Sequence, residues 1–287
     1  TNTYTAQFGG NGGVVNATSK SGTNSLHGSV YEFFRNSALD SRSPFDSLVL
    51  PGDTAAKVPE FRRNQYGGSL GGPIKKDKAF FFANYEGLRS AQGTSTVVQG
   101  TPDVNAHQGY LPCNVAGAAY ASTCNAATNL AFVGVAPSIA PILALFPSVP
   151  ATPTGAGNLT EILTNITHED YLLARADYNF SEKDSIFARW VRDTASFSAP
   201  QALAPFVELD QTNNNFATIE ERHIFSPTLV NLVHVSLTRP TETQTQASPQ
   251  IPSLVFGPGR PNGHVALTGG PNLGLGGPQG LAPNWLV

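Results

Sequence analysis

Two cysteines are the residues whose chemistry the sequence constrains most directly. Cys113 and Cys124 lie eleven positions apart in a polar, alanine-rich stretch. Such a pair can be a disulfide in an oxidising compartment, two unrelated free thiols, or part of a zinc site. A structural zinc ion needs four ligands, and His107 is the only further candidate nearby, so the spacing disfavours a metal.

A glycine-rich run at residues 9–13 is the other feature that could do chemistry, by cradling a phosphate group. No strand pattern precedes this run, no lysine follows it at Walker spacing, and the G-x-G-x-x-G pattern is not met. Serine, histidine and carboxylate residues are scattered without the spacing of a nucleophile elbow or a metal site. We therefore expect no enzymatic activity, no cofactor and no metal.

Composition narrows the class of protein further. Only 13% of the 287 residues are charged, against roughly 25% in ordinary soluble domains. The net charge is −3 and no basic run occurs, which argues against nucleic acid as a partner. No run of 18 apolar residues is present, so we expect no transmembrane helix. The chain lacks methionine and starts with Thr1, so we expect it to be a fragment.

Seven segments alternate polar and apolar side chains, a pattern that predicts β-strands. Strands of nine to eleven residues cross a bilayer at a tilt, whereas soluble strands are usually nearer five or six residues. The lengths therefore favour membrane-spanning strands. The predicted strands are residues 26–36, 63–71, 78–88, 168–180, 185–195, 214–225 and 229–239.

The connections between these segments alternate in length. Short turns are predicted at 72–77, 181–184 and 226–228, and the intervening connections are long, above all the loop 90–167. The three short turns should therefore lie at one end of an antiparallel meander and the long loops at the other. Bacterial outer-membrane barrels have this asymmetry, with short periplasmic turns and longer extracellular loops.

Side-chain alternation predicts which positions face lipid and which face the barrel lumen. Four charged residues fall on the polar face: Arg175, Asp177, Arg189 and Asp193. An ion-pair ladder that braces the barrel wall is the favoured interpretation of these lumen charges, and contact with a transported ligand is the alternative. In the first predicted strand, neither set of alternate residues is uniformly apolar or polar, so which set faces lipid stays open. The predicted lipid-facing residues are Leu172, Ala174, Ala176, Tyr178, Ile186, Ala188, Trp190, Val233, Val235 and Leu237.

Three motifs resemble one known family, the TonB-dependent receptors. GGVVNATSKSGTN at 12–24 resembles the end of the plug domain, and the most specific block is FRRNQYGGSLGGPI at 61–74 followed by KAFFFANYEGLR at 78–89. HGSVYEFFRNSALD at 27–40 resembles the first barrel strand of the Oar-like branch, which is common in Acidobacteria. That branch carries an N-terminal carboxypeptidase-regulatory-like domain. The match is dense over about the first 90 residues and looser beyond them.

The resemblance implies a partial antiparallel transmembrane β-barrel, all-β and open, from the bacterial outer membrane. Residues 1–25 would be the end of the plug domain and its linker. Residues 26–287 would be the first part of the barrel, with a long loop at 90–167 and a Pro/Gly-rich loop at 240–287. The family's TonB box, complete plug, regulatory domain and last barrel strand are not found in the sequence. Seven of an expected 22 strands are predicted.

The resemblance also implies a function: energy-coupled uptake of an unidentified ligand, with outer-membrane lipid and the TonB system as partners. A structural or adhesive barrel protein without transport is the alternative. The strand count places the loop 90–167 at the extracellular end, where thiols oxidise. We therefore predict a Cys113–Cys124 disulfide in this loop, and a short helix at 138–146, ended by Pro147, that folds over the barrel mouth.

Overall fold

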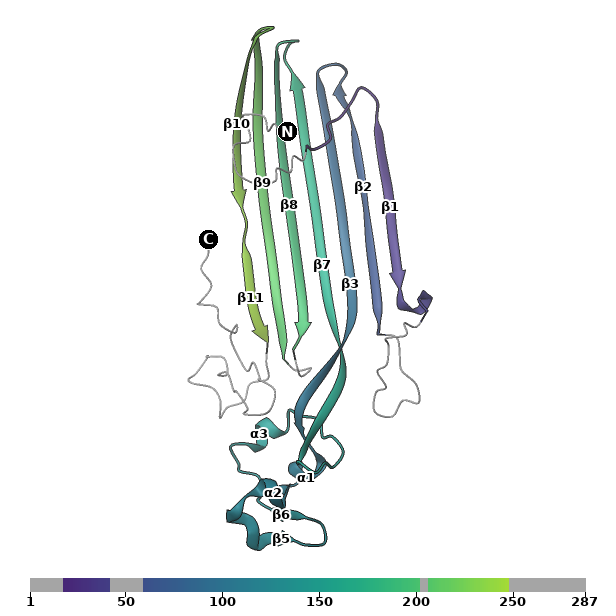
Figure 1. Ribbon diagram of the computed structural model, residues 1–287. Helices are drawn as coiled ribbons and strands as arrows, with labels where there is room; N and C mark the ends of the chain where they lie inside the picture. Colours follow the sequence, from purple (N-terminus) through teal and green to yellow (C-terminus); the bar gives the residue numbers. More distant parts are fainter. Residues whose placement is uncertain (1–17, 42–58, 202–205, 248–287) are drawn as a thin grey trace, which may run out of the picture.

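Long antiparallel strands in simple meander order form almost the whole structure. The computed structural model describes residues 18–41, 59–201 and 206–247. One sheet runs in the order β1-β2-β3-β7-β8-β9-β10, and β11 continues alongside β9 (Figure 1). The strands are β1 (His27–Asn36), β2 (Phe61–Lys75), β3 (Ala79–Pro102), β7 (Ala156–Asn179), β8 (Asp184–Pro200), β9 (Val207–Ser226), β10 (Leu229–Arg239) and β11 (Glu242–Ala247).

All seven predicted strands are present, and the prediction that the three short turns share one end of the sheet is confirmed (Figure 1). The first turn is shorter than predicted. β2 continues to Lys75, which pairs with Ala79, so only residues 76–78 turn the chain where 72–77 were expected. The sheet is open, with β1 at one edge of the described part and β10 and β11 at the other.

The predicted loop 90–167 is wrong at both ends, because β3 and β7 extend far into it. β2 pairs with β3 only as far as Gln92, and β8 pairs with β7 only as far as Ile166. Beyond those residues β3 and β7 pair with each other alone, as a twisted two-stranded hairpin extension (residues 93–102 and 156–165; Figure 1). Its sequence is rich in threonine and also contains Val97, Val98 and Ile162, all residue types that favour strands.

A small lobe joins the two strands of the hairpin extension at its tip. Asp103 is fully buried and caps α1, accepting hydrogen bonds from the backbone N–H groups of Asn105 and Ala106 and from that of Thr152 at 2.8 Å. The apolar core of the lobe contains Ala131, Ile142, Phe146 and Val149. The lobe's elements are α1 (Val104–His107), β4 (Tyr110–Pro112), α2 (Cys113–Ala116), η2 (Ala118–Thr123), β5 (Cys124–Asn125), β6 (Leu130–Phe132) and α3 (Ala140–Leu143).

The helix expected at 138–146 is a single turn, α3, with Ile142 and Phe146 buried in the lobe. Figure 1 shows this lobe beyond the ends of the neighbouring strands. A further short helix, η1 (Ser37–Leu39), follows β1. None of the helices in the described segments has the length and apolar character needed to span a membrane.

The predicted loop 240–287 is also wrong at its start. Pro240 interrupts β10, but the chain resumes pairing with β9 as β11, beginning with Glu242 opposite Thr212. The break is local because proline removes one backbone donor without preventing the next residues from extending. The rest of that loop, residues 248–287, and residues 1–17 of the predicted plug segment lie outside the described residues.

The register fixes which side chains share a face, because directly paired residues in an antiparallel sheet point the same way. Ala174 pairs with Trp190, Trp190 with Ala217, and Ala217 with Leu237. All ten residues predicted to face lipid lie on this one face, which we call the outer face. Arg175, Asp177, Arg189 and Asp193 lie on the opposite, inner face.

Candidate functional site

The inner face is the crowded side of the sheet. Its side chains Phe82, Leu173 and Thr218 are buried, whereas Val235 and Leu237 on the outer face are 65% and 68% exposed. Part of the crowding comes from the N-terminal segment 18–25, which lies against the inner face. Gly22 of this segment is buried, and a Cβ added to it would lie 2.4 Å from the carbonyl oxygen of Phe81. The close backbone approach therefore requires glycine there.

Arg175 joins the barrel wall to the N-terminal segment. Its guanidinium donates to Asp177 Oδ1 at 2.7 Å and to the hydroxyl and carbonyl oxygens of Ser19 at 2.8 and 3.2 Å. The same group stacks over the Phe187 ring, 4.1 Å from its centroid. The Arg175 and Asp177 side chains are only 15% and 17% exposed. A planar guanidinium can serve three partners at once because its donors form a fixed fork.

The other two predicted lumen charges do not join this cluster. Arg189 pairs directly opposite Arg175 across the strands, but its described hydrogen bond, at 3.4 Å, goes to the Thr218 hydroxyl. Asp193 lies further along β8, and its buried Oδ1 atom has no hydrogen-bond partner within the described residues. The four residues therefore form one ion pair along β7 and not a ladder across the wall.

A second link holds the N-terminal segment at the turn end of the sheet. The Asn24 side-chain amide donates to Asp77 Oδ1 at 2.5 Å, and the Asp77 backbone N–H donates to Asn24 Oδ1 at 2.8 Å. Asp77 sits in the β2–β3 turn with a φ of 60°, a conformation that aspartate tolerates better than most residues. Sequence reasoning missed both links, because Ser19 and Asn24 are far in sequence from Arg175 and Asp77.

The inner face also carries a hydrogen-bonded group that sequence reasoning missed. Glu86 accepts a hydrogen bond from the Tyr31 hydroxyl at 2.5 Å and another from the Gln65 amide at 2.6 Å. Tyr31 and Glu86 belong to β1 and β3, and Gly67 of β2 lies between them. Added to Gly67, a Cβ would lie 2.7 Å from the tyrosine hydroxyl. The only sequence signal was the glycine-rich motif around Gly67.

Cys113 and Cys124 form a disulfide in the lobe, with their Cα atoms 5.7 Å apart. This separation is within the usual range for disulfides. Cys113 opens α2 directly after β4, and Cys124 opens β5. Since β4 and β5 both pair with β6, the bond closes a loop whose two ends are already held by one small sheet.

Three potential metal ligands gather at the turn end of the outer face. Single atoms of Asp184, Glu221 and His223 lie within 4.8 Å of one another. His223 is already hydrogen-bonded to Asp184, and its ring packs edge-on against Phe225 at 4.3 Å between centroids. These contacts account for the histidine position without an ion.

The geometry is that of a wall with two different faces. The outer face offers apolar side chains to a nonpolar environment, and the inner face holds polar groups and the N-terminal segment. A barrel wall needs this division, with lipid on one side and a polar interior on the other. The inner face also brings a hydroxyl, an imidazole and a carboxylate together on β9 and β10: Ser236 Oγ lies 2.6 Å from His234 Nε2, and His234 Nδ1 lies 3.1 Å from Glu220 Oε2.

Comparison with known proteins agrees with this two-faced wall. A family model for an outer membrane beta barrel domain matches residues 18–284. The TonB-dependent transporter Oar of Myxococcus xanthus is 36% identical over 86 residues, which are 29% of this chain and 8% of that transporter. The chain therefore matches only a small part of that relative's length. No solved structure matches the chain. The chain belongs to the outer membrane beta barrel domain family and is a protein of the bacterial outer membrane.

Proposed function

We propose that this chain is part of a TonB-dependent transporter, in which residues 18–25 link a lumenal plug to the barrel wall. The observation that carries the proposal is the contact between Arg175 and Ser19. It ties the segment that precedes the first strand to the inner face of the sheet. A segment in that position would have to lose or exchange these hydrogen bonds if the plug rearranges during transport.

Two further observations support the proposal. The chain resembles the Oar-like branch of these receptors, and the similar Myxococcus protein is named a TonB-dependent transporter. The residues of the plug-like motif that the structure describes lie on the inner face, as a plug would. Residues 1–25 would then be the end of the plug, the strands the first part of the barrel, and TonB the energy source.

The proposal can be tested by locking the N-terminal segment to the wall. Ser19→Cys with Arg175→Cys places two thiols about the length of an arginine side chain apart in the full-length protein. A short bis-methanethiosulfonate cross-linker, which joins thiols through cleavable disulfide bonds, should abolish growth on the nutrient whose use is lost when the gene is deleted, and reductant should restore it. Each single substitution, treated in the same way, is the control for effects on the native disulfide.

The nutrient is found first by comparing a deletion strain with its parent on a panel of defined nutrients, with TonB present and absent. The parent should grow better than the deletion strain on one nutrient when TonB is present. Loss of this difference between the two strains when both lack TonB supports energy-coupled uptake. Unchanged growth on every nutrient, or full uptake by the locked protein, would contradict the proposal.

A structural or adhesive role is the second candidate. The disulfide-closed lobe at the tip of the β3–β7 hairpin extension is the observation that favours it, because the lobe projects beyond the neighbouring strands (Figure 1). Deletion of residues 104–152 should then reduce surface attachment while leaving uptake unchanged.

A further inference from the structure

The outer face changes from apolar to polar between two adjacent rows of paired residues. Trp190 belongs to the last apolar row, and tryptophan in that position is typical of the aromatic girdle at a membrane interface. The change therefore marks the extracellular border of the lipid-facing band. The apolar row is Ala174, Trp190, Ala217 and Leu237, and the next row away from the short turns is Leu172, Arg192, Asn215 and Arg239.

This border carries positive charge. Arg192 of β8 and Arg239 of β10 point outward on either side of Asn215 of β9, and neither has a carboxylate partner in the part of the chain that the structure describes. The nearby outward carboxylate, Asp170, is already neutralised. Arg89 donates to both of its oxygens, at 2.8 and 2.9 Å, and Tyr85 donates to it at 2.6 Å. The arginines of β8 and β10 are thus available to an anion.

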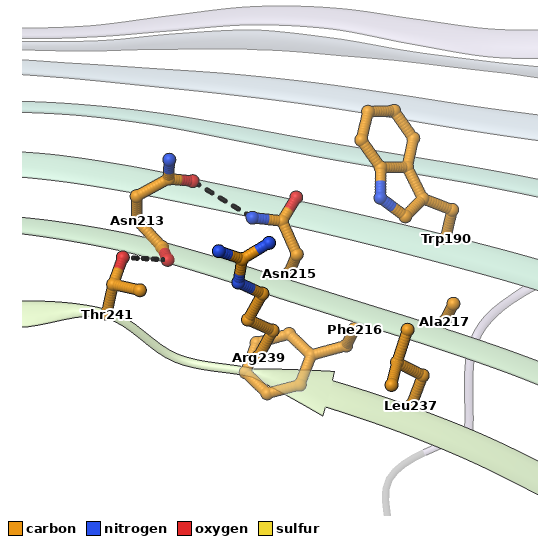
Figure 2. Close-up of a pocket in the computed structure, with 8 residues that line it drawn as sticks. All are labelled: Trp190, Asn213, Asn215, Phe216, Ala217, Leu237, Arg239 and Thr241. Carbon is orange, nitrogen blue, oxygen red and sulfur yellow. Dashed lines mark hydrogen bonds between the residues drawn. The ribbon is translucent and has the colours of Figure 1, made fainter. Parts of the chain in front are cut away.

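A pocket of about 560 Å³ lies at this border, where Pro240 interrupts the edge strand (Figure 2). Trp190 and Leu237 line its apolar end, and Arg239, Asn213 and Asn215 line its polar end. The polar end is held in shape by two hydrogen bonds. The Asn215 amide donates to Asn213 Oδ1 at 3.0 Å, and the Thr241 hydroxyl donates to the Asn213 carbonyl at 2.8 Å.

A second pocket, of about 440 Å³, continues from the first toward the loop end of the strands. The two pockets share Asn213 and Thr241. The second is lined mainly by hydroxyl and amide groups, including those of Thr194, Gln211 and Thr243. From the membrane outward, the outer face therefore presents apolar groups, then a guanidinium with amides, and then hydroxyls.

We propose that the two pockets together bind one phosphorylated glycolipid of the outer leaflet. Its acyl chains would lie along Trp190 and Leu237, its phosphate would accept hydrogen bonds from Arg239, and its sugar hydroxyls would meet the second pocket. Arginine suits phosphate because its planar fork makes two parallel hydrogen bonds to the oxygens. The site is on the lipid side of the wall, so it is separate from any ligand taken up through the lumen.

Binding can be measured by native mass spectrometry of the full-length protein in detergent, titrated with diphosphoryl lipid A. Arg239→Ala should weaken binding by about tenfold or more, since a charge-assisted hydrogen bond contributes about 1.5–3 kcal/mol. Asn215→Asp, which keeps the side-chain size but repels phosphate, should weaken it similarly. Circular dichroism of each variant shows whether the strands still form.

Arg62→Ala is the matched control, because Arg62 is on the same face and toward the same end but on β2, where it is paired with Glu60 at 2.7 Å. It should change binding less than about twofold. Equal weakening by Arg62→Ala and Arg239→Ala would show diffuse charge attraction and overturn the proposal. Lipid A without its phosphates should bind at least about tenfold more weakly. Inorganic phosphate that displaces lipid A at similar concentrations would reveal a site for the free ion and also overturn it.

Discussion

Tyr31 and Glu86 are hydrogen-bonded at 2.5 Å across an intervening strand, with Gly67 beneath the bond. The tyrosine can reach over β2 only because Gly67 has no side chain. The same arrangement recurs at Gly71, where an added Cβ would lie 2.9 Å from the Phe82 ring and 3.2 Å from His27. At Gly67 and Gly71, the glycines of β2 therefore leave room for larger side chains of β1 and β3 to contact each other above the strand.

Gly67→Ala should destabilise the folded protein by about 1–3 kcal/mol, because the new methyl group overpacks a filled position. An added Cβ there would lie 2.5 Å from the Tyr85 carbonyl oxygen, which is backbone and cannot move aside freely. Urea unfolding of the full-length protein in liposomes measures the cost. Gly68→Ala on the outer face is the control; its nearest contact would be 3.1 Å, so it should cost less than half as much. Equal costs would contradict the role given to Gly67.

Arg175→Ala should release the N-terminal segment from the wall. It leaves the Asp177 carboxylate without its partner on the crowded inner face, at a cost of about 3 kcal/mol. Hydrogen exchange of residues 18–25 should therefore become faster. Arg189→Ala removes the same charge from the paired position without touching Ser19 and should leave that exchange unchanged. Unchanged exchange in Arg175→Ala would show that Ser19 is held by other contacts.

Replacing both Cys113 and Cys124 by serine should loosen the lobe and leave the sheet intact. Closing a loop of about a dozen residues contributes on the order of 3 kcal/mol when the bond is unstrained. Hydrogen exchange should rise at residues 110–132 while the paired strands stay protected. Intact-mass analysis of the unreduced full-length protein should find no free thiols, and two free thiols would refute the disulfide.

Glu161 should make the hairpin extension less stable as pH rises. The residue lies in the part of β7 that pairs with β3 alone, and burial raises the pKa of its carboxyl above the usual value. Its Oε2 atom is buried without a partner in the described structure. The folded state therefore favours the protonated carboxyl of Glu161. Its contribution to stability is full below the pKa of the unfolded state, and it is lost as pH rises through the pKa of the folded state.

Glu161→Gln should therefore slow hydrogen exchange at residues 156–165 at pH 7 and change it little at pH 4, relative to the unmodified protein at each pH. Glu182→Gln, in the exposed β7–β8 turn, is the control and should have no effect on that segment. Faster exchange in Glu161→Gln at pH 7 would show that the ionised carboxylate stabilises the extension.

The sequence predicted the strands and the faces of their residues well, because alternation in segments such as Leu172–Tyr178 is a local property, although Leu173 places an apolar side chain on the inner face. It predicted the ends of β3 and β7 poorly. Residues 90–98 contain serine, glutamine, glycine and threonine, so their apolar alternation is broken although they pair with Leu159–Thr167. β11 was missed because Pro240 and its neighbours have the composition of a loop.

The inner-face contacts were not predictable in the same way. Arg175 and Asp177 were identified as inward charges, but Ser19 lies 156 residues from Arg175 in the sequence. Asp193 was expected in a ladder with them, yet the register places it opposite Tyr171 and Asn214. Such partners depend on which strands become neighbours, and no local pattern encodes that information.

The most direct test of this account compares arginine substitutions on the two faces of the wall. Ala188 lies in the apolar row one step inside the border, opposite Ala176 and Ile219, and Ser236 lies on the inner face, where its hydroxyl is 3.4 Å from that of Thr218. Folding of the full-length protein into liposomes gives the free energy of each variant. We expect Ala188→Arg to cost roughly 2–4 kcal/mol and Ser236→Arg much less. Equal costs at the two positions would contradict the assignment of the outer face to lipid.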